Sequence, residues 1–141
     1  MPTFRILRAL LAFIALYHLS LGVLAIVSDG AFVQLARALG GATAETSPQA
    51  VALMHAFGAY LAAFGVAMAV AAWDPVKYRA LVSIAVVLFA LRVAQRALTI
   101  DESVAAYGIT ALRAWVNLGI VGAIGAVLLV YRIKLGRAAS A

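Results

Sequence analysis

Residues Leu81–Thr99 read LVSIAVVLFALRVAQRALT. The stretch is apolar enough to sit in a bilayer, and its length is close to the ~20 residues that a helix needs to cross the hydrocarbon core. Its last two turns nevertheless carry Arg92, Gln95 and Arg96. Ionisable groups are costly inside a membrane and usually face protein or water. We therefore expect the rest of the chain to be arranged around this polar end.

The composition of the chain is that of an integral membrane protein. Of its 141 residues, 67% are hydrophobic and 11% are charged, whereas soluble domains carry about 25% charged residues. No cysteine is present, which excludes disulfides, thiolate metal sites and thiol redox chemistry. The net charge of +6 does not indicate a nucleic-acid partner, since no basic stripe with interleaved aromatic residues occurs.

Four apolar stretches predict four transmembrane helices. They cover about residues 9–28, 49–73, 79–98 and 110–131. Arg5 and Arg8 before the first stretch are also typical of a cleaved signal peptide, but the length of the apolar run favours a retained helix. Asp74 and Pro75 predict a tight turn, because a helix cap followed by proline suits the start of a helix. The predicted fold is an all-α, antiparallel bundle of four transmembrane helices in a single domain.

Short sequence patterns predict the connections between the spans and the faces by which the spans pack together. Phe32, Leu35, Ala36 and Leu39 recur on one helical face. This predicts a short helix, ended by Gly40 and Gly41, at the membrane interface or on the end of the bundle. Thr99–Gly108 is predicted to be a polar connection. Small residues predict packing faces on the second and fourth spans: Ala52, Gly58, Ala59, Ala62, Gly65 and Ala69, and Gly119, Gly122, Ala123 and Ala126.

Basic residues predict the orientation of the spans in the membrane. Seven lie at the two ends of the chain and in the turn between spans two and three: Arg5, Arg8, Lys77, Arg79, Arg132, Lys134 and Arg137. The opposite side holds Arg37 and the acidic residues Asp29, Glu45, Asp101 and Glu102. Both termini are therefore expected in the cytoplasm.

With this topology, every span places a polar side chain in the outer half of the membrane. These candidate ligand-binding residues are His18, His55, Arg92, Gln95, Arg96, Arg113 and Asn117. His18 lies ~15 Å and His55 ~10 Å from the outer end of its span, at ~1.5 Å per residue. The inner half is almost purely aliphatic, so this asymmetry is the main functional signal in the sequence.

Each of these residues also has a purely structural interpretation. Arg96 and Arg113 are placed where they can snorkel to the interface, and Arg92 could pair with Asp101 or Glu102. The histidines could bond backbone carbonyls, and Asn117 could form an interhelical hydrogen bond.

The chemistry available to this cluster favours binding over catalysis. An acid–base enzyme would need a carboxylate or a perturbed pair inside a span, and all five acidic residues lie at span ends or in connections. A cationic, hydrogen-bonding pocket suits a lipid head group, a quinone or a carboxylate on an apolar tail. The alternative is a b-type haem with His18 and His55 as axial ligands, in a membrane electron carrier.

One stretch resembles a known kind of protein. His55–Leu98, HAFGAYLAAFGVAMAVAAWDPVKYRALVSIAVVLFALRVAQRAL, is similar to the middle of small four-helix bacterial membrane proteins of the DoxX-like kind. The shared features are a Gly-rich second span, a Pro-containing turn with Tyr-Arg, and a third span that ends in Arg. The hairpin is also similar to a four-helix scaffold family of sterol biosynthesis, whose members tether enzymes. The resemblance implies a bacterial inner-membrane protein with an accessory or scaffold role, beside other membrane subunits or a second copy of itself.

Overall fold

The computed structural model describes residues 4–40 and 47–138, and within these ranges the chain forms six helices. In chain order they are α1 (Arg5–Val27), α2 (Asp29–Gly40), α3 (Pro48–Trp73), α4 (Arg79–Leu98), α5 (Ile100–Tyr107) and α6 (Ala111–Ala138). The all-α prediction is confirmed, and α2 is the short helix predicted between the first two spans. The predicted end of that helix at Gly41, and Glu45, lie outside the described residues.

Four helices, α1, α3, α4 and α6, are long and apolar enough to cross a membrane. At most 33% of the most apolar window of any of them is buried inside the protein. Most of the apolar side chains of these helices therefore lie on the outside of the protein. Exposing them to water would be unfavourable, whereas exposing them to lipid is not. The chain is a small multi-pass membrane protein.

Two predicted caps are used differently: Ser47 caps the start of α3, while Asp74 lies in a turn and α4 begins only at Arg79. The Ser47 hydroxyl accepts a hydrogen bond of 3.3 Å from the Ala50 N–H at the start of α3. In the turn before α4, Asp74 Oδ1 accepts bonds of 3.1 and 3.0 Å from the N–H groups of Val76 and Lys77. Ser47 thus provides an acceptor for an N–H group in the first turn of α3, and Asp74 does so for two N–H groups in the loop before α4. These N–H groups would otherwise lack a partner.

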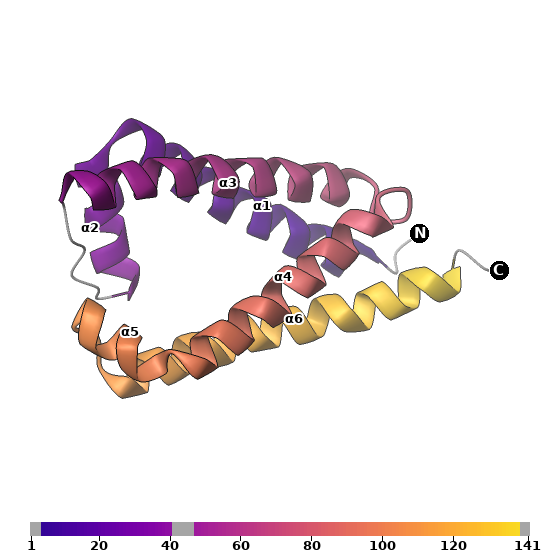
Figure 1. Cartoon of the computed structure of the whole chain (residues 1–141). Helices are drawn as coiled ribbons and strands as arrows, with labels where there is room; N and C mark the ends of the chain where they lie inside the picture. Colours follow the sequence, from indigo (N-terminus) through magenta and orange to yellow (C-terminus); the bar gives the residue numbers. More distant parts are fainter. Residues whose placement is uncertain (1–3, 41–46, 139–141) are drawn as a thin grey trace.

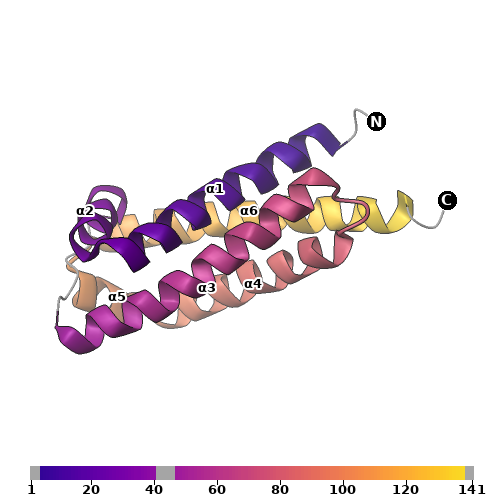
Figure 2. The same ribbon diagram turned by 90° about the horizontal axis from the view of Figure 1, so that it is seen from above.

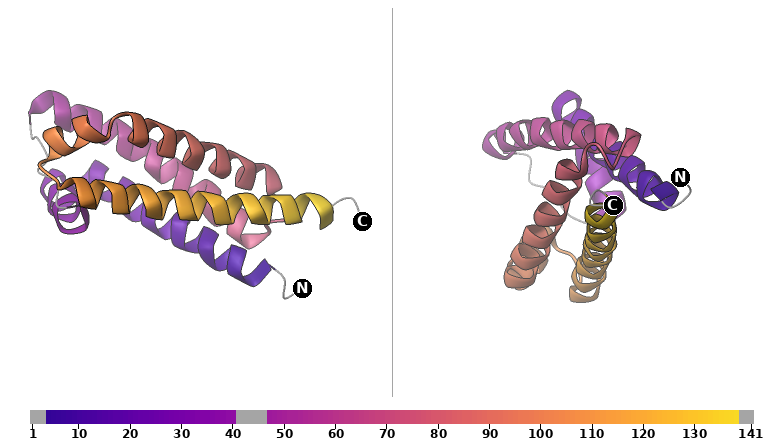
Figure 3. Two further views of the ribbon diagram at one scale, coloured as in Figure 1. Left: turned by 90° about the horizontal axis from the view of Figure 1, so that it is seen from below. Right: turned by 90° about the vertical axis from the view of Figure 1, so that its right-hand side faces the viewer.

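The four long helices form two antiparallel pairs. Helix α1 packs along α3, and α4 packs along α6 (Figure 1). The two pairs meet at the end of the molecule that holds both termini and the Asp74–Tyr78 turn, and they diverge toward α2 and α5 (Figures 1 and 3). Figure 2 shows both termini at the end opposite α2 and α5. We call these the closed end and the open end. Both termini lie at the closed end, as the antiparallel topology predicts.

The shared hydrophobic core lies near the closed end. It contains Phe4, Leu7, Leu11, Ile14 and Ala15 of the N-terminal segment and α1, Met68 and Ala71 of α3, Val82, Ala85 and Phe89 of α4, and Leu128 and Leu135 of α6. There the Ser83 hydroxyl also accepts a hydrogen bond from Arg132 Nε and donates one of 3.1 Å to the Arg79 carbonyl, which ties α4 to α6. The four helices are thus packed together over only part of their length.

The contact between α1 and α3 is close because glycine backbones meet. Gly58 and Gly65 of α3 are buried, and so is Gly22 of α1. A Cβ atom added at Gly22 would lie 2.5 Å from the Ala62 nitrogen, and one at Gly65 would lie 2.8 Å from the Leu19 nitrogen. Small residues permit this approach, as they do in other membrane helix pairs.

The predicted small-residue faces are only partly used in this contact. On α3 the buried face is Gly58, Leu61, Gly65, Met68 and Ala71, while Ala52, Ala59 and Ala69 are exposed. On α6, Gly122 is half-buried and Gly119, Ala123 and Ala126 are exposed. Small residues occur around much of the circumference of these helices, so their spacing alone does not identify the contact face.

The predicted polar connection Thr99–Gly108 is mostly helical, because it contains α5. Asp101 and Glu102 occupy the first turn of α5, where carboxylates complement the free N–H groups of a helix start. Gly108 ends the helix with φ 62°, a left-handed conformation that glycine adopts without a steric penalty. This helix was not predicted because Asp101, Glu102 and Ser103 make its start polar, although Ile100, Val104 and Tyr107 recur on one helical face.

Candidate functional site

His18 is a buried residue of α1, with 3% of its surface exposed. Its Nδ1 lies 2.8 Å from the carbonyl oxygen of Ile14, one turn earlier, to which it donates a hydrogen bond. The ring meets Phe64 of α3 edge-on at 4.9 Å between centroids, and Tyr17 at 5.2 Å. The imidazole is therefore held by the backbone of its own helix and by two aromatic rings.

His55 is exposed on α3 and lies at a different level from His18. Since His18 packs against Phe64, nine residues of α3 separate the level of one histidine from that of the other. At 1.5 Å per residue this is about 13 Å along the helix axis. The two imidazoles do not face a common space, so they do not fit the axial positions of one haem. The sequence predicted depths that differ by only ~5 Å, and the register of α1 against α3 corrects this to the larger separation.

Arg92 and Arg96 lie one turn apart on α4, and both are half-buried. Arg92 of α4 lies within electrostatic range of His18 of α1, on the other helix pair. Arg96 lies close enough to three other groups to interact with them electrostatically: Arg92 on its own helix, Tyr17 on α1 and Tyr107 on α5. We call these five residues the arginine cluster. It joins side chains from three helices at the point where the pairs diverge.

The arginine cluster contains no carboxylate. The charged or ionisable groups that act on His18 and Arg96 are those of the cluster itself. Asp101 and Glu102 are exposed, and neither forms an ion pair with Arg92 or Arg96 among the residues that the structure describes. The predicted internal ion pair is thus absent from that part of the chain, and no carboxylate that the structure describes pairs with the two guanidinium groups.

The remaining predicted site residues lie apart from this cluster. Gln95 is exposed, and its amide donates a 2.9 Å hydrogen bond to the Thr99 hydroxyl, which bonds back to the Gln95 carbonyl at 3.0 Å. On α6, Arg113 is exposed and Asn117 is half-buried. Of the seven predicted residues, the structure brings together His18, Arg92 and Arg96.

Two members of the cluster, Tyr17 and Tyr107, were not predicted. Tyrosine is common at membrane interfaces because it has an apolar ring and a polar tip. Its presence near a span end therefore gives little functional signal. The position of Tyr17 next to His18 was the only clue in the sequence.

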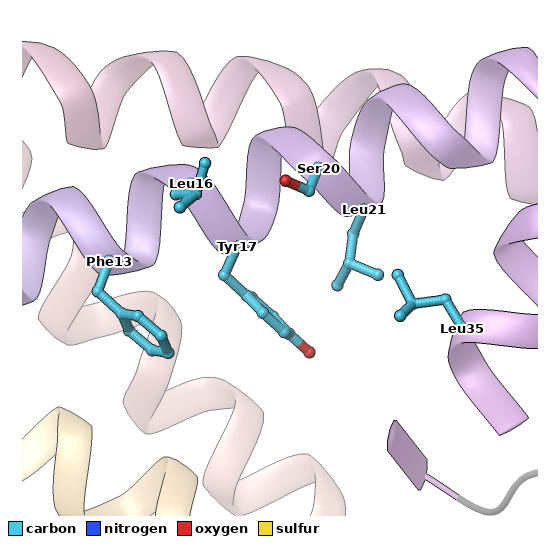
Figure 4. A pocket seen from close by; sticks show the side chains of 6 residues that line it. All are labelled: Phe13, Leu16, Tyr17, Ser20, Leu21 and Leu35. Carbon is cyan, nitrogen blue, oxygen red and sulfur yellow. The ribbon is translucent and has the colours of Figure 1, made fainter. Parts of the chain in front are cut away.

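An apolar hollow of about 220 Å³ lies beside the arginine cluster. We call it the α1 hollow. It is lined by Phe13, Leu16, Tyr17, Ser20 and Leu21 of α1 and by Leu35 of α2. Figure 4 shows Leu21 and Leu35 facing each other, and the Tyr17 ring extending away from α1 with its hydroxyl at the far end. Tyr17 therefore belongs both to the hollow and to the cluster.

Comparison of the chain with protein-family models, with curated proteins and with solved structures finds no match. The resemblance to DoxX-like proteins stays a prediction.

The side chains of the site determine what it can hold. Within residues 4–40 and 47–138, no three His, Cys, Asp or Glu side chains lie close enough together to hold a metal ion. The cluster offers two guanidinium groups and two phenol hydroxyls next to an apolar surface. Such an arrangement can neutralise and orient a polar group at the end of an apolar chain.

Proposed function

We propose that this protein binds a ligand with an apolar tail, a membrane lipid or a quinone, between its two helix pairs. It would act as an accessory or binding component and not as an enzyme. The proposal rests chiefly on one observation: the shared core ends before the open end, where half-buried arginines and an apolar hollow lie side by side.

The shape of the α1 hollow supports a ligand that is long and flexible. Its volume of about 220 Å³ is below the ~300–1,000 Å³ of sites that enclose a compact small molecule. Phe13 is 60% exposed and Leu16 67%, so the hollow is open along its side. An alkyl chain can lie in the α1 hollow while the polar end of the ligand remains at the arginine cluster.

Retention of a bound molecule tests this function. Protein extracted in mild detergent should show, by native mass spectrometry, an adduct of discrete mass that organic solvent releases. Leu21→Trp should reduce the adduct by filling the hollow, whereas Leu53→Trp should not, because Leu53 is 73% exposed on α3, away from the hollow. Wild-type protein that is stable and free of any adduct would contradict the proposal.

We also propose that both termini face the cytoplasm of a bacterial inner membrane. Both lie at the closed end, next to the turn that carries Lys77 and Arg79, and cytoplasmic ends are enriched in basic residues. The arginine cluster then lies toward the outer leaflet. A fluorescent protein that folds only in the cytoplasm should light up when fused after Ala141. Activity of a periplasm-specific reporter at that position would reverse the assignment.

A further inference from the structure

We propose that the ligand is an anionic phospholipid, with its phosphate between Arg92 and Arg96 and an acyl chain in the α1 hollow. The inference rests on the binding function proposed above and adds the chemical class of the ligand.

The first support is the charge of the arginine cluster. Arg92 and Arg96 are separated by four residues on one helix, about 6 Å along its axis, and both are half-buried. Two guanidinium groups at this spacing repel each other, and partial burial weakens their solvation. A bound anion would relieve both effects.

The second support is the geometry of the available donors. A guanidinium group presents a planar fork of N–H donors that matches the oxygens of a phosphate. Two such forks one turn apart can contact different oxygens of the same phosphate. The hydroxyl of Tyr17, which lies within electrostatic range of Arg96, can donate to a remaining oxygen. The cluster therefore places a donor from α1 within range of the donors on α4.

The third support is the continuity between the charged and apolar parts of the site. Tyr17 lines the α1 hollow with its ring, and its hydroxyl is directed away from α1 (Figure 4). A ligand whose phosphate lies at this hydroxyl has its acyl chain directly beside Phe13, Leu16 and Leu21. This order of groups, anionic head and then hydrocarbon, is that of a phospholipid.

A quinone fits the same site less well. Its head group is neutral, so it would leave the two guanidinium charges unbalanced. A phospholipid of the surrounding bilayer is also present at high local concentration, and basic pockets between membrane helices bind anionic head groups. The helix pairs diverge toward the open end, where α2 and α5 lie (Figure 1).

Titration of the delipidated full-length protein in detergent provides the test, with binding followed by native mass spectrometry. The probes are dioleoylphosphatidylglycerol, dioleoylphosphatidylcholine and ubiquinone-10. We expect phosphatidylglycerol to bind at least ~10-fold more tightly than phosphatidylcholine, since 10-fold is about 1.4 kcal/mol and one charge-assisted contact contributes that much. Arg92→Gln and Arg96→Gln should each weaken phosphatidylglycerol binding ~10-fold. Arg113→Gln, an exposed arginine outside the cluster, should leave it unchanged.

The outcomes separate this inference from the function it rests on. Equal affinity for the two phospholipids, or unchanged binding in both cluster variants, would overturn the anionic ligand. Tight binding of ubiquinone-10 without phosphatidylglycerol would overturn it as well, while the proposed function would stand. Failure of the wild-type protein to bind any of the three probes would overturn both. If circular dichroism shows that Arg92→Gln does not fold, the affinities of Arg96→Gln and Arg96→Lys for phosphatidylglycerol provide the test instead. Arg96→Lys should bind phosphatidylglycerol more tightly than Arg96→Gln.

Discussion

Replacement of Gly22 by alanine is expected to separate α1 from α3 and to lower the free energy of unfolding by about 1–3 kcal/mol, the usual cost of overpacking. The added Cβ atom would lie 2.5 Å from the Ala62 nitrogen and 2.7 Å from the Gly58 carbonyl oxygen. Both are backbone atoms of a helix, so neither can rotate aside as a side chain would. The strain must be relieved by moving the whole of α3 away from α1.

A glycine elsewhere in the chain provides the matched control for Gly22→Ala. Gly119 of α6 has no heavy atom within 4 Å of the position of an added Cβ. Gly119→Ala should leave the melting temperature unchanged or raise it slightly, since alanine is the better helix former. Thermal unfolding in detergent, followed by circular dichroism at 222 nm, measures both variants. Equal melting temperatures for the two would contradict the close contact of α1 with α3.

Replacement of His18 by alanine is expected to cost about 2–5 kcal/mol, the range for deleting a large buried side chain. The ring fills the space between α1 and Phe64 and supports Tyr17. Its removal leaves a cavity at the boundary between the shared core and the arginine cluster. Because Tyr17 loses an aromatic neighbour, the same variant should also weaken ligand binding.

The second histidine is the control for His18→Ala. His55 is exposed on α3, and surface substitutions usually change stability by less than about 0.5 kcal/mol. Chemical unfolding of both variants in mixed micelles gives the two free energies. A larger loss in His55→Ala than in His18→Ala would show that the packing of His18 described above is wrong.

The helix boundaries were largely predictable because they depend on local chemistry. Helices α3 and α4 begin within a residue of the predicted spans. Ser47 caps the start of α3, and Asp74 bonds backbone N–H groups in the turn that precedes α4. Helices α1 and α6 extend beyond the predicted spans, to Arg5 and Ala138. Basic residues mark where an apolar stretch ends, but their long side chains remain compatible with a continuing helix.

The arrangement of the helices was less predictable because it depends on contacts between distant segments. The close approach at Gly22 was missed, since a lone glycine in an apolar span gives no sign of its partner. Arg92 and Arg96 were identified from the cost of charge inside a membrane. Tyr17 and Tyr107 could not be identified from the sequence, because only the packing of the helix pairs brings these tyrosines near the arginines.

The central claim is that the two helix pairs are packed together at the closed end and separate toward the open end. Pulsed electron paramagnetic resonance tests it directly, because the chain has no cysteine and accepts spin labels at chosen exposed sites. One pair of labels, at Val70→Cys and Ile84→Cys, reports the distance between α3 and α4 near the closed end. The other, at Leu53→Cys and Leu98→Cys, reports it at the open end.

We predict a clearly longer mean distance for the Leu53–Leu98 pair than for the Val70–Ile84 pair, in lipid bilayers as in detergent. The reason is that α3 and α4 diverge from the turn that joins them (Figure 1). In a bundle with α3 and α4 packed along their whole length, the axes would stay about 8–10 Å apart. The same mean distance for both pairs would therefore contradict the open site on which the proposed binding depends.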